Sequence, residues 1–223
     1  MQPQEAQILD TWHQNAKPWI HAIANQEIES RNLITNQAIV DAILSLHPNT
    51  IWDAGCGEGW LSRALHENGI DYFGTDAIPE LIDAAAIKGG NYAVASYQQI
   101  IVGSYLPPEK FEAILFNFSL FGNEMVEQLL QAIRNHLLPS GHLIIQTLHP
   151  HTACGDADYE DGWRAGSWVG FADTFCNPAP WYFRTLESWA TLLHKCGFQI
   201  ICIKEPIHPG TKKPASLILI AGL

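Results

Sequence analysis

The chain has 223 residues, of which 47 % are hydrophobic and 16 % charged, so we expect a compact globular protein with one large domain, or one domain with an appendage. Its 12 lysines and arginines against 23 aspartates and glutamates give a net charge of −11, which disfavours non-specific binding to nucleic acid or anionic lipid. We expect neither a membrane span nor an export signal. Five cysteines without a CxxC pair indicate a reduced cytoplasmic protein rather than a disulfide scaffold.

The first 45 residues have a helical pattern that carries Trp12, Trp19 and Ile23. We expect residues 1–45 to form an N-terminal helical cap that packs on the main domain, which then covers residues 46–223.

From Pro48 onward, short apolar runs alternate with helical patterns. This alternation is typical of β/α units that bury a parallel sheet between helix layers, and it predicts the α/β class. The predicted strands lie at about residues 50–53, 70–75, 92–96, 112–118, 142–148, 198–204 and 216–222. Two further helices are predicted around residues 124–137 and 186–196, ending at Pro139-Ser140-Gly141 and at Gly197.

Residues 149–184 interrupt this alternation. They contain eight aromatic residues, with prolines and glycines but no sustained period. A stretch of this length without structure of its own inside a compact domain is usually a functional lid or binding loop. We therefore predict a lid-like insertion, and the alternative is an ordered excursion that only covers the sheet.

The run from Ile51 to Trp60 joins a strand, a glycine-rich turn and a helix start. Glycines 55, 57 and 59 permit positive φ angles and let a ligand approach bare backbone, and the helix start presents free N–H groups. Asp76 closes the next predicted strand, where a carboxylate can accept both hydroxyls of a ribose. Together the loop and the acid indicate an adenosine-type cofactor.

A nicotinamide site would need the spacing GxGxxG, but its third glycine position is Trp60. No lysine follows to form a phosphate loop. The spacing is instead GxGxG with Asp53 two residues before it. An acidic loop suits a cationic sulfonium cofactor with an amino-acid tail better than it suits a pyrophosphate.

The run Asp53-Ala54-Gly55-Cys56-Gly57-Glu58-Gly59 resembles motif I of the class I S-adenosylmethionine-dependent methyltransferases. The resemblance extends from about residue 48 to the C-terminus, residues 149–184 excepted, and includes Asp76, the turn 137–143 and Cys196-Gly197-Phe198. It implies a Rossmann-like seven-stranded sheet that is mostly parallel, with an antiparallel last strand and helices on both faces. One departure is Ser96-Tyr97, where many members have an acid near the adenine.

The same resemblance implies roles for individual residues. Gly55, Cys56 and Gly57 would approach the methionine part of S-adenosylmethionine, with Asp53 beneath them. Asp76 would hold the ribose. The other implied positions are Ala77 and Ile78 beside the adenine, Ser96 and Tyr97 at its edge, Asn117 and Phe118 near the transferable methyl, and Arg31 at the cofactor carboxylate.

Several of these residues also have purely structural explanations. Asp53 can order the turn and Asn117 can cap a strand without touching a ligand. Glu58 is favourable in a first helical turn beside the helix dipole. Arg31 can equally be an ordinary surface arginine that binds no ligand.

We expect no metal site. The acidic run 156–161 lacks the glycine and the last glutamate of a calcium loop. His149 and His151 have no third ligand at a typical spacing. These histidines follow the fifth predicted strand, at the edge where ligands bind in open α/β sheets, so we predict that they act as acid or base, with Tyr159 next in line.

The sequence therefore favours an enzyme that transfers a methyl group to a small-molecule acceptor, with aromatic and carboxylate-bearing molecules as the candidates. Within the lid we expect the acceptor to contact Trp163, Trp168 and Trp181, with Arg184 pairing with a carboxylate. A methyltransferase acting on protein or RNA and a non-catalytic cofactor-binding module remain alternatives, although the negative charge argues against RNA. The acceptor, the methylated atom and the oligomeric state are left open.

Overall fold

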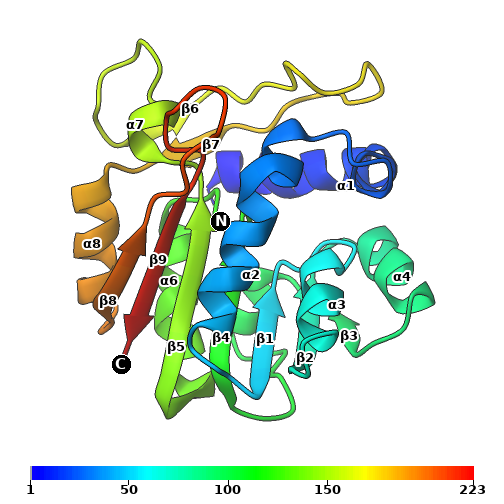
Figure 1. Ribbon diagram of the computed structural model, residues 1–223, viewed down its shortest axis with the longest axis vertical. Helices are drawn as coiled ribbons and strands as arrows, with labels where there is room; N and C mark the ends of the chain where they lie inside the picture. The colour runs from blue at the N-terminus through cyan, green and yellow to red at the C-terminus, as the bar shows by residue number, and fades with distance from the viewer. Residues whose placement is uncertain (1) are drawn as a thin grey trace.

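The computed structural model describes residues 2–223 and contains a central seven-stranded sheet (Figure 1). Its order is β3-β2-β1-β4-β5-β9-β8, and β9 runs antiparallel to both neighbours while β1 to β5 pair in parallel. The predicted α/β class, the seven strands and the antiparallel last strand are confirmed. The strands are β1 (Thr50–Ala54), β2 (Asp71–Asp76), β3 (Tyr92–Val94), β4 (Phe111–Asn117), β5 (Leu137–Thr147), β8 (Gln199–Lys204) and β9 (Leu217–Gly222).

The central strand β4 shows why the sheet needs cover on both faces. Ala113 and Leu115 belong to one core cluster, whereas Ile114 and Phe116 belong to the other, and all four side chains are buried. Side chains alternate between the two faces of a strand, so a continuous apolar run must be buried on both.

Helices cover both faces (Figure 1). On one face α2 and α3 contribute Ile39, Ile43, Leu61 and Leu65 to the core. On the other, α6 and α8 contribute residues such as Val126, Leu129 and Trp189, and the α6 residues recur at the spacing of an amphipathic helix. The helices after the first are α2 (Asn36–Leu44), α3 (Trp60–His66), α4 (Pro79–Ile87), α5 (Tyr97–Ile101), α6 (Glu124–Ile133), the 3-10 helix η2 (Arg134–His136) and α8 (Leu186–Lys195).

The helix predicted for residues 124–137 is shorter, and the following strand is longer, than expected. β5 begins at Leu137, which pairs with Phe111. The register then shifts between Phe111 and Ala113, so Pro139-Ser140-Gly141 lies within β5 at this irregularity. A proline and a glycine suggested a turn, but a bulged strand end accommodates both.

Two segments lie beyond the edge at which β1, β4 and β5 end (Figure 1). One comprises α1 (Pro3–Ala24) and the π-helix η1 (Arg31–Thr35). α2, the last part of the predicted 1–45 cap, is instead part of the layer on the sheet, and residue 1 lies outside the described residues. A cap boundary at residue 45 stays a prediction.

The second segment is the insertion at 149–184, which is less irregular than its sequence suggested. It contains α7 (Pro150–Ala153) and a small antiparallel sheet of β6 (Gly162–Arg164) and β7 (Trp181–Phe183). Three-residue strands are too short to show a period in the sequence, which explains why the pattern did not reveal them. Within residues 2–223, no helix combines the length and apolar character needed to cross a bilayer.

Candidate functional site

The glycine-rich turn after β1 is held against β2 by backbone hydrogen bonds. The N–H groups of Gly55 and Cys56 both donate to the carbonyl oxygen of Thr75, at 2.7 and 3.0 Å. Gly55 has a φ of +79°, and a Cβ there would come within 2.5 Å of the Tyr97 hydroxyl oxygen. Gly57 has a φ of +57°, but a Cβ there would meet only the Trp19 Nε1, at 3.7 Å. The turn therefore needs glycine at 55 for packing, and at 57 it leaves space open.

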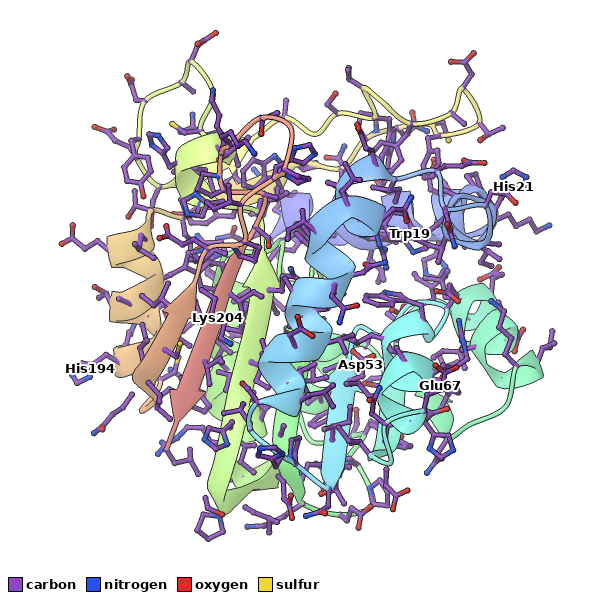
Figure 2. The ribbon with its side chains drawn as sticks, viewed as in Figure 1. Trp19, His21, Asp53, Glu67, His194 and Lys204 are labelled. Atoms are coloured by element: carbon purple, nitrogen blue, oxygen red, sulfur yellow. The ribbon has the colours of Figure 1, made fainter. Side chains whose placement is uncertain are left out.

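A first cavity of about 180 Å³ lies at this turn. All the residues that the sequence proposed for the cofactor line it, except Ile78. Ile78 is buried behind it and donates its N–H to Asp76. The residues in the lining are Arg31, Asp53, Gly55, Cys56, Gly57, Asp76, Ala77, Ser96, Tyr97, Asn117 and Phe118. Figure 2 labels Asp53 at the end of β1 and Trp19 on α1, and both of these side chains line the cavity.

The Asp76 carboxylate connects the turn to the start of α4. Its Oδ2 accepts the Gly57 N–H and its Oδ1 accepts the Ile78 N–H, both at 2.9 Å. Burial raises the pKa of Asp76, while these backbone donors act in the opposite direction. Asp76 therefore orders the turn as well as lining the cavity.

Asp53 is 1 % exposed and half satisfied. Its Oδ2 accepts a hydrogen bond from the Ser62 hydroxyl at 2.9 Å, and its Oδ1 has no partner among the described residues. Burial raises the pKa of Asp53 to about 7, with smaller contributions from Asp76 and Glu58. An unpaired buried carboxylate oxygen is costly, so it marks a position that a cationic ligand group can satisfy.

Glu58 is a cavity residue that the sequence left undecided. It is 1 % exposed, and its Oε2 accepts from Arg63 at 2.6 Å and from Lys88 at 3.4 Å. Its Oε1 has no partner in the described part of the chain. The signal was its place inside the glycine-rich motif, but the favourable helix dipole explained an acid there equally well.

Arg31 projects from the π-helix η1 between two indole rings. Its guanidinium carbon lies 5.5 Å from the Trp19 ring centroid and 4.8 Å from that of Trp60. Its Nε donates to Asn36, whereas Nη2 is buried and has no partner among residues 2–223. Burial lowers the pKa of Arg31 to about 10, against the opposite effect of Glu58. A buried, unpaired donor of this kind fits an anionic ligand group.

The end of β4 forms the wall beside the glycine turn. The Asn117 Oδ1 is buried and has no partner in residues 2–223. Phe118 has a φ of +51°, a strained conformation for a residue with a large side chain, and its N–H donates to the Gln146 carbonyl oxygen at 2.8 Å. Phe118 lines the first cavity and also a second one.

The second cavity, of about 360 Å³, adjoins the first. Its walls come from α1, from residues 28–35, from the end of β4 and from the insertion. Two of the predicted acceptor-binding residues, Trp168 and Trp181, line it. The other aromatic residues in its walls are Trp12, Trp19, Phe118, Phe121 and Phe171.

Buried polar contacts join α1 to the insertion above these cavities. Asn15, which is fully buried, accepts the Cys176 N–H and donates to the Cys176 carbonyl oxygen, at 2.9 and 2.8 Å. Thr11 donates to the Asn177 carbonyl oxygen at 2.9 Å. The indole of Trp168 also donates to Cys176, and its ring packs edge-on against Trp12. Sequence patterns gave no sign of the contacts between α1 and the insertion, because their partners are some 160 residues apart.

The remaining predicted site residues lie outside both cavity linings. His149 is buried, and its Nε2 lies 2.7 Å from Glu205 Oε1. His151 is exposed, and the Tyr159 hydroxyl accepts the Leu186 N–H. Their roles as acid or base stay predictions. Within residues 2–223 there is no cluster of potential metal ligands.

Trp163 and Arg184 also lie apart from the cavities. Trp163 packs edge-on against Tyr182. Arg184 is 4 % exposed, donates to the carbonyl oxygens of Gly122 and Asn123, and lies over the rings of Tyr182 and Trp189. Its donors are directed to these partners, so binding an acceptor carboxylate would require it to leave them.

Comparisons with known proteins agree with this geometry. The family model described as a methyltransferase domain matches residues 24–203. An uncharacterised methyltransferase of Schizosaccharomyces pombe is 22 % identical over 180 residues, which are 77 % of this chain and 67 % of the relative.

Solved structures share the fold. An S-adenosylmethionine-dependent methyltransferase from Mesorhizobium loti superposes with a TM-score of 0.63 at 22 % identity, covering 82 % of this chain and 96 % of that one. The Burkholderia thailandensis 1,6-didemethyltoxoflavin-N1-methyltransferase was solved with 1,6-didemethyltoxoflavin and S-adenosylhomocysteine. It superposes with a TM-score of 0.65 at 20 % identity, covering 97 % of this chain and 85 % of that one.

Proposed function

This chain belongs to the methyltransferase domain family and is an S-adenosylmethionine-dependent methyltransferase, and from that premise we propose that its methyl acceptor is a small molecule bound in the second cavity. The first cavity holds the cofactor. The observation that carries the proposal is the junction of the two cavities, which share Phe118, Arg31 and aromatic residues of α1.

The chemistry of the first cavity fits S-adenosylmethionine. Its amino-acid tail carries an ammonium and a carboxylate, and the cavity offers unpaired carboxylate oxygens of Asp53 and Glu58 together with the unpaired guanidinium nitrogen of Arg31. Gly57 leaves open the space that a Cβ would fill. The ligand would form hydrogen bonds with buried polar atoms that have no partner among the described residues.

In this assignment each residue binds or orients rather than reacts. Asp53 and Glu58 hold the ammonium, Arg31 the carboxylate and Asp76 the ribose hydroxyls. The adenine lies among Ala77, Ser96 and Tyr97, with Asn117 and Phe118 beside the methyl group. Ile78 lies outside this lining and acts through its hydrogen bond to Asp76. Cys56 contacts the cofactor through its backbone. Burial keeps the pKa of its thiol well above its usual value, so the thiol stays protonated at neutral pH.

The bound cofactor supplies an electrophilic methyl group, so the protein needs chiefly to align the acceptor with it and to exclude water. The second cavity serves that purpose because its walls are rich in aromatic side chains and its volume falls in the range of pockets for small ligands. The toxoflavin-type relative, whose acceptor is a small molecule, supports the same choice.

A protein or RNA acceptor is the alternative. RNA is disfavoured by the net charge of −11. A cavity bounded by both α1 and the insertion also suits a compact ligand better than a polymer. We place the enzyme in the cytoplasm as part of this proposal, since all five cysteines are free.

Two measurements test the proposal. Calorimetry with S-adenosylhomocysteine should show one site per chain. Incubation with methyl-labelled S-adenosylmethionine and fractionated cell extract, followed by mass spectrometry, should place the label in the metabolite fraction. Label in the RNA or protein fraction alone would overturn the small-molecule acceptor, and cofactor binding without transfer to any fraction would favour a non-catalytic module.

A further inference from the structure

The second cavity contains almost no charge. Of the residues that line it, Arg31 alone carries a charge at neutral pH, and none is a histidine, carboxylate, lysine, cysteine or tyrosine. Under the proposed function Arg31 pairs with the cofactor carboxylate. An anionic acceptor would then have no free cation to bind, and a cationic one would lie near Arg31 and the sulfonium. Because burying an uncompensated charge is costly, the lining selects an uncharged ligand.

The walls also specify shape. Trp12 lies 6.2 Å, centroid to centroid, from Trp168, and Trp168 lies 5.2 Å from Phe171. Trp19 stacks on Phe171 at 6.4 Å, with 26° between the planes. Rings contributed by α1 and by the insertion therefore meet around one space. Two of these pairs pack edge-on, at 81° and 74°, and one is stacked, and apolar walls built from such rings favour an aromatic ligand.

Besides Arg31 Nη2, a second unsatisfied polar group lies in the wall of this cavity. Thr35, in η1, is 2 % exposed and lines the second cavity, and its hydroxyl has no partner among the described residues. Its own carbonyl oxygen is already occupied, since it accepts from Gln146 Nε2 at 3.1 Å. A buried hydroxyl without a partner is the feature expected where a ligand supplies the missing hydrogen bond.

We propose that the second cavity binds an uncharged, planar nitrogen heterocycle that accepts a hydrogen bond from Thr35 and is methylated on an unprotonated ring nitrogen. This inference rests on the proposed function. The lining offers no base to remove a proton from a hydroxyl. A ring nitrogen needs none, because its lone pair forms the new N–C bond while the S–C bond electrons return to sulfur. The positive charge passes from sulfur to nitrogen, and no proton is released.

Binding to the complex with S-adenosylhomocysteine tests the ligand class. The probes are quinoxaline, quinoxaline-2-carboxylate and quinoxalin-2-ylmethylammonium, which share one ring system and differ in charge. Quinoxaline should bind at least about tenfold more tightly than either charged probe. Equal or weaker binding of the neutral probe would overturn the inference. Failure of S-adenosylhomocysteine itself to bind would instead count against the proposed function.

Thr35→Val tests the hydrogen bond without changing side-chain size. The substitution should lower the affinity for quinoxaline about three- to tenfold and leave the affinity for S-adenosylhomocysteine unchanged. Naphthalene, which cannot accept the bond, should bind both proteins equally. Val169→Ala is the matched control, because Val169 is 91 % exposed in the insertion beside Trp168. An unaltered quinoxaline affinity in Thr35→Val would remove Thr35 from the acceptor site.

The methylated atom is tested by single-turnover reaction with quinoxaline at saturating cofactor. Mass spectrometry should detect the N-methylquinoxalinium cation, and the rate should stay level from about pH 6 to 9, because no enzyme base titrates. Binding without N-methyl product, or a rate that rises with pH, would overturn the assignment of an unprotonated nitrogen.

Discussion

The two cavities are built by different means. The first is formed where strands end, by backbone turns and by charged groups such as Asp53, Asp76 and Glu58. The second is formed by side chains of α1, η1 and the insertion, and it holds a single charge. They meet along a border lined by residues that belong to both cavities, namely Ile8, Trp12, Trp19, Arg31, Phe118 and Phe121.

This difference divides the work of the enzyme. The first cavity binds the cofactor, whose structure does not vary, so the polar atoms of the cavity can be held in place by rigid elements. The second cavity depends on how α1 and the insertion pack against each other. Hydrogen bonds such as those between Asn15 and Cys176, which we call the clasp, hold these two segments together. Changes in the first cavity should therefore affect cofactor affinity, whereas changes in the clasp between α1 and the insertion should affect the acceptor.

The largest effect is expected for Gly57→Val. The valine side chain would enter the first cavity, in the space toward Trp19, and the cofactor should lose about 100-fold or more in affinity. Calorimetry with S-adenosylhomocysteine measures this. Gly69→Val is the matched control, because Gly69 has a φ of +81° in a turn with nothing within 4 Å of its Cβ position. It shares the backbone strain and should bind normally.

Asp76→Ala should weaken cofactor binding by about 1.5 to 3 kcal/mol, the range for hydrogen bonds to a charged group. The melting temperature should also fall, because the variant loses the hydrogen bonds from the Gly57 and Ile78 N–H groups. Asp71→Ala, at the exposed start of the same strand, controls for a general effect on β2. Unchanged affinity in a folded Asp76→Ala protein would remove this carboxylate from the ribose site.

Asn15→Ala should loosen the insertion while sparing the first cavity. It removes two partly buried hydrogen bonds to the Cys176 backbone, at a cost of about 0.5 to 1.5 kcal/mol each. Limited proteolysis should then cut the segment 166–177 faster, and S-adenosylhomocysteine affinity should hold. Lys17→Ala, exposed on the same helix, should behave as the wild type. Equal cleavage of both variants would contradict the clasp.

Asp53 should make cofactor affinity depend on pH. Its pKa is about 7 because it is buried, and only the carboxylate attracts the cofactor ammonium. Affinity should rise about tenfold from pH 6 to a plateau above pH 8. Asp53→Asn should bind more weakly, without this slope. A slope that persists in Asp53→Asn would assign the titration to another group.

The same carboxyl group should influence stability without cofactor. Its pKa is raised on folding, so the folded state holds the proton more tightly than the unfolded state does. The contribution is present below the unfolded pKa and is lost as pH rises from about 4 to about 7. Asp53→Asn should lack this decline in thermal unfolding measurements.

The sequence predicted the first cavity well because its geometry is local. The residues from Asp53 to Gly59 fold as one strand, turn and helix start, and Asp76 follows at the end of the adjacent parallel strand. The second cavity could not be read in the same way. Trp168 was predicted to contact the acceptor, but the sequence did not show that it packs against Trp12, which lies 156 positions earlier in the chain. Contacts of that range depend on tertiary packing, which no periodic pattern records.

Glu58 and Thr35 show a second reason for incomplete prediction. Both residue types are common on surfaces, and their importance here rests on burial without a partner. Burial of this kind is visible only once the surrounding walls are in place. The histidines after β5 illustrate the converse, because their position in the chain indicated a functional edge but their side chains lie outside both linings.

The smallest effect on turnover is expected for His149→Ala and His151→Ala. The acid or base role predicted from the sequence would make the loss of turnover about 10²-fold. Both histidines, however, lie outside the described cavity linings, and His149 pairs with Glu205. We therefore expect turnover to change by less than about threefold at saturating cofactor and quinoxaline. His149→Ala should still lower the melting temperature, because it breaks a half-buried pair, whereas the exposed His151 should be silent in both measurements. A 10²-fold loss of turnover in either variant with normal cofactor affinity would place a base at the acceptor after all, and would contradict methylation of a bare ring nitrogen.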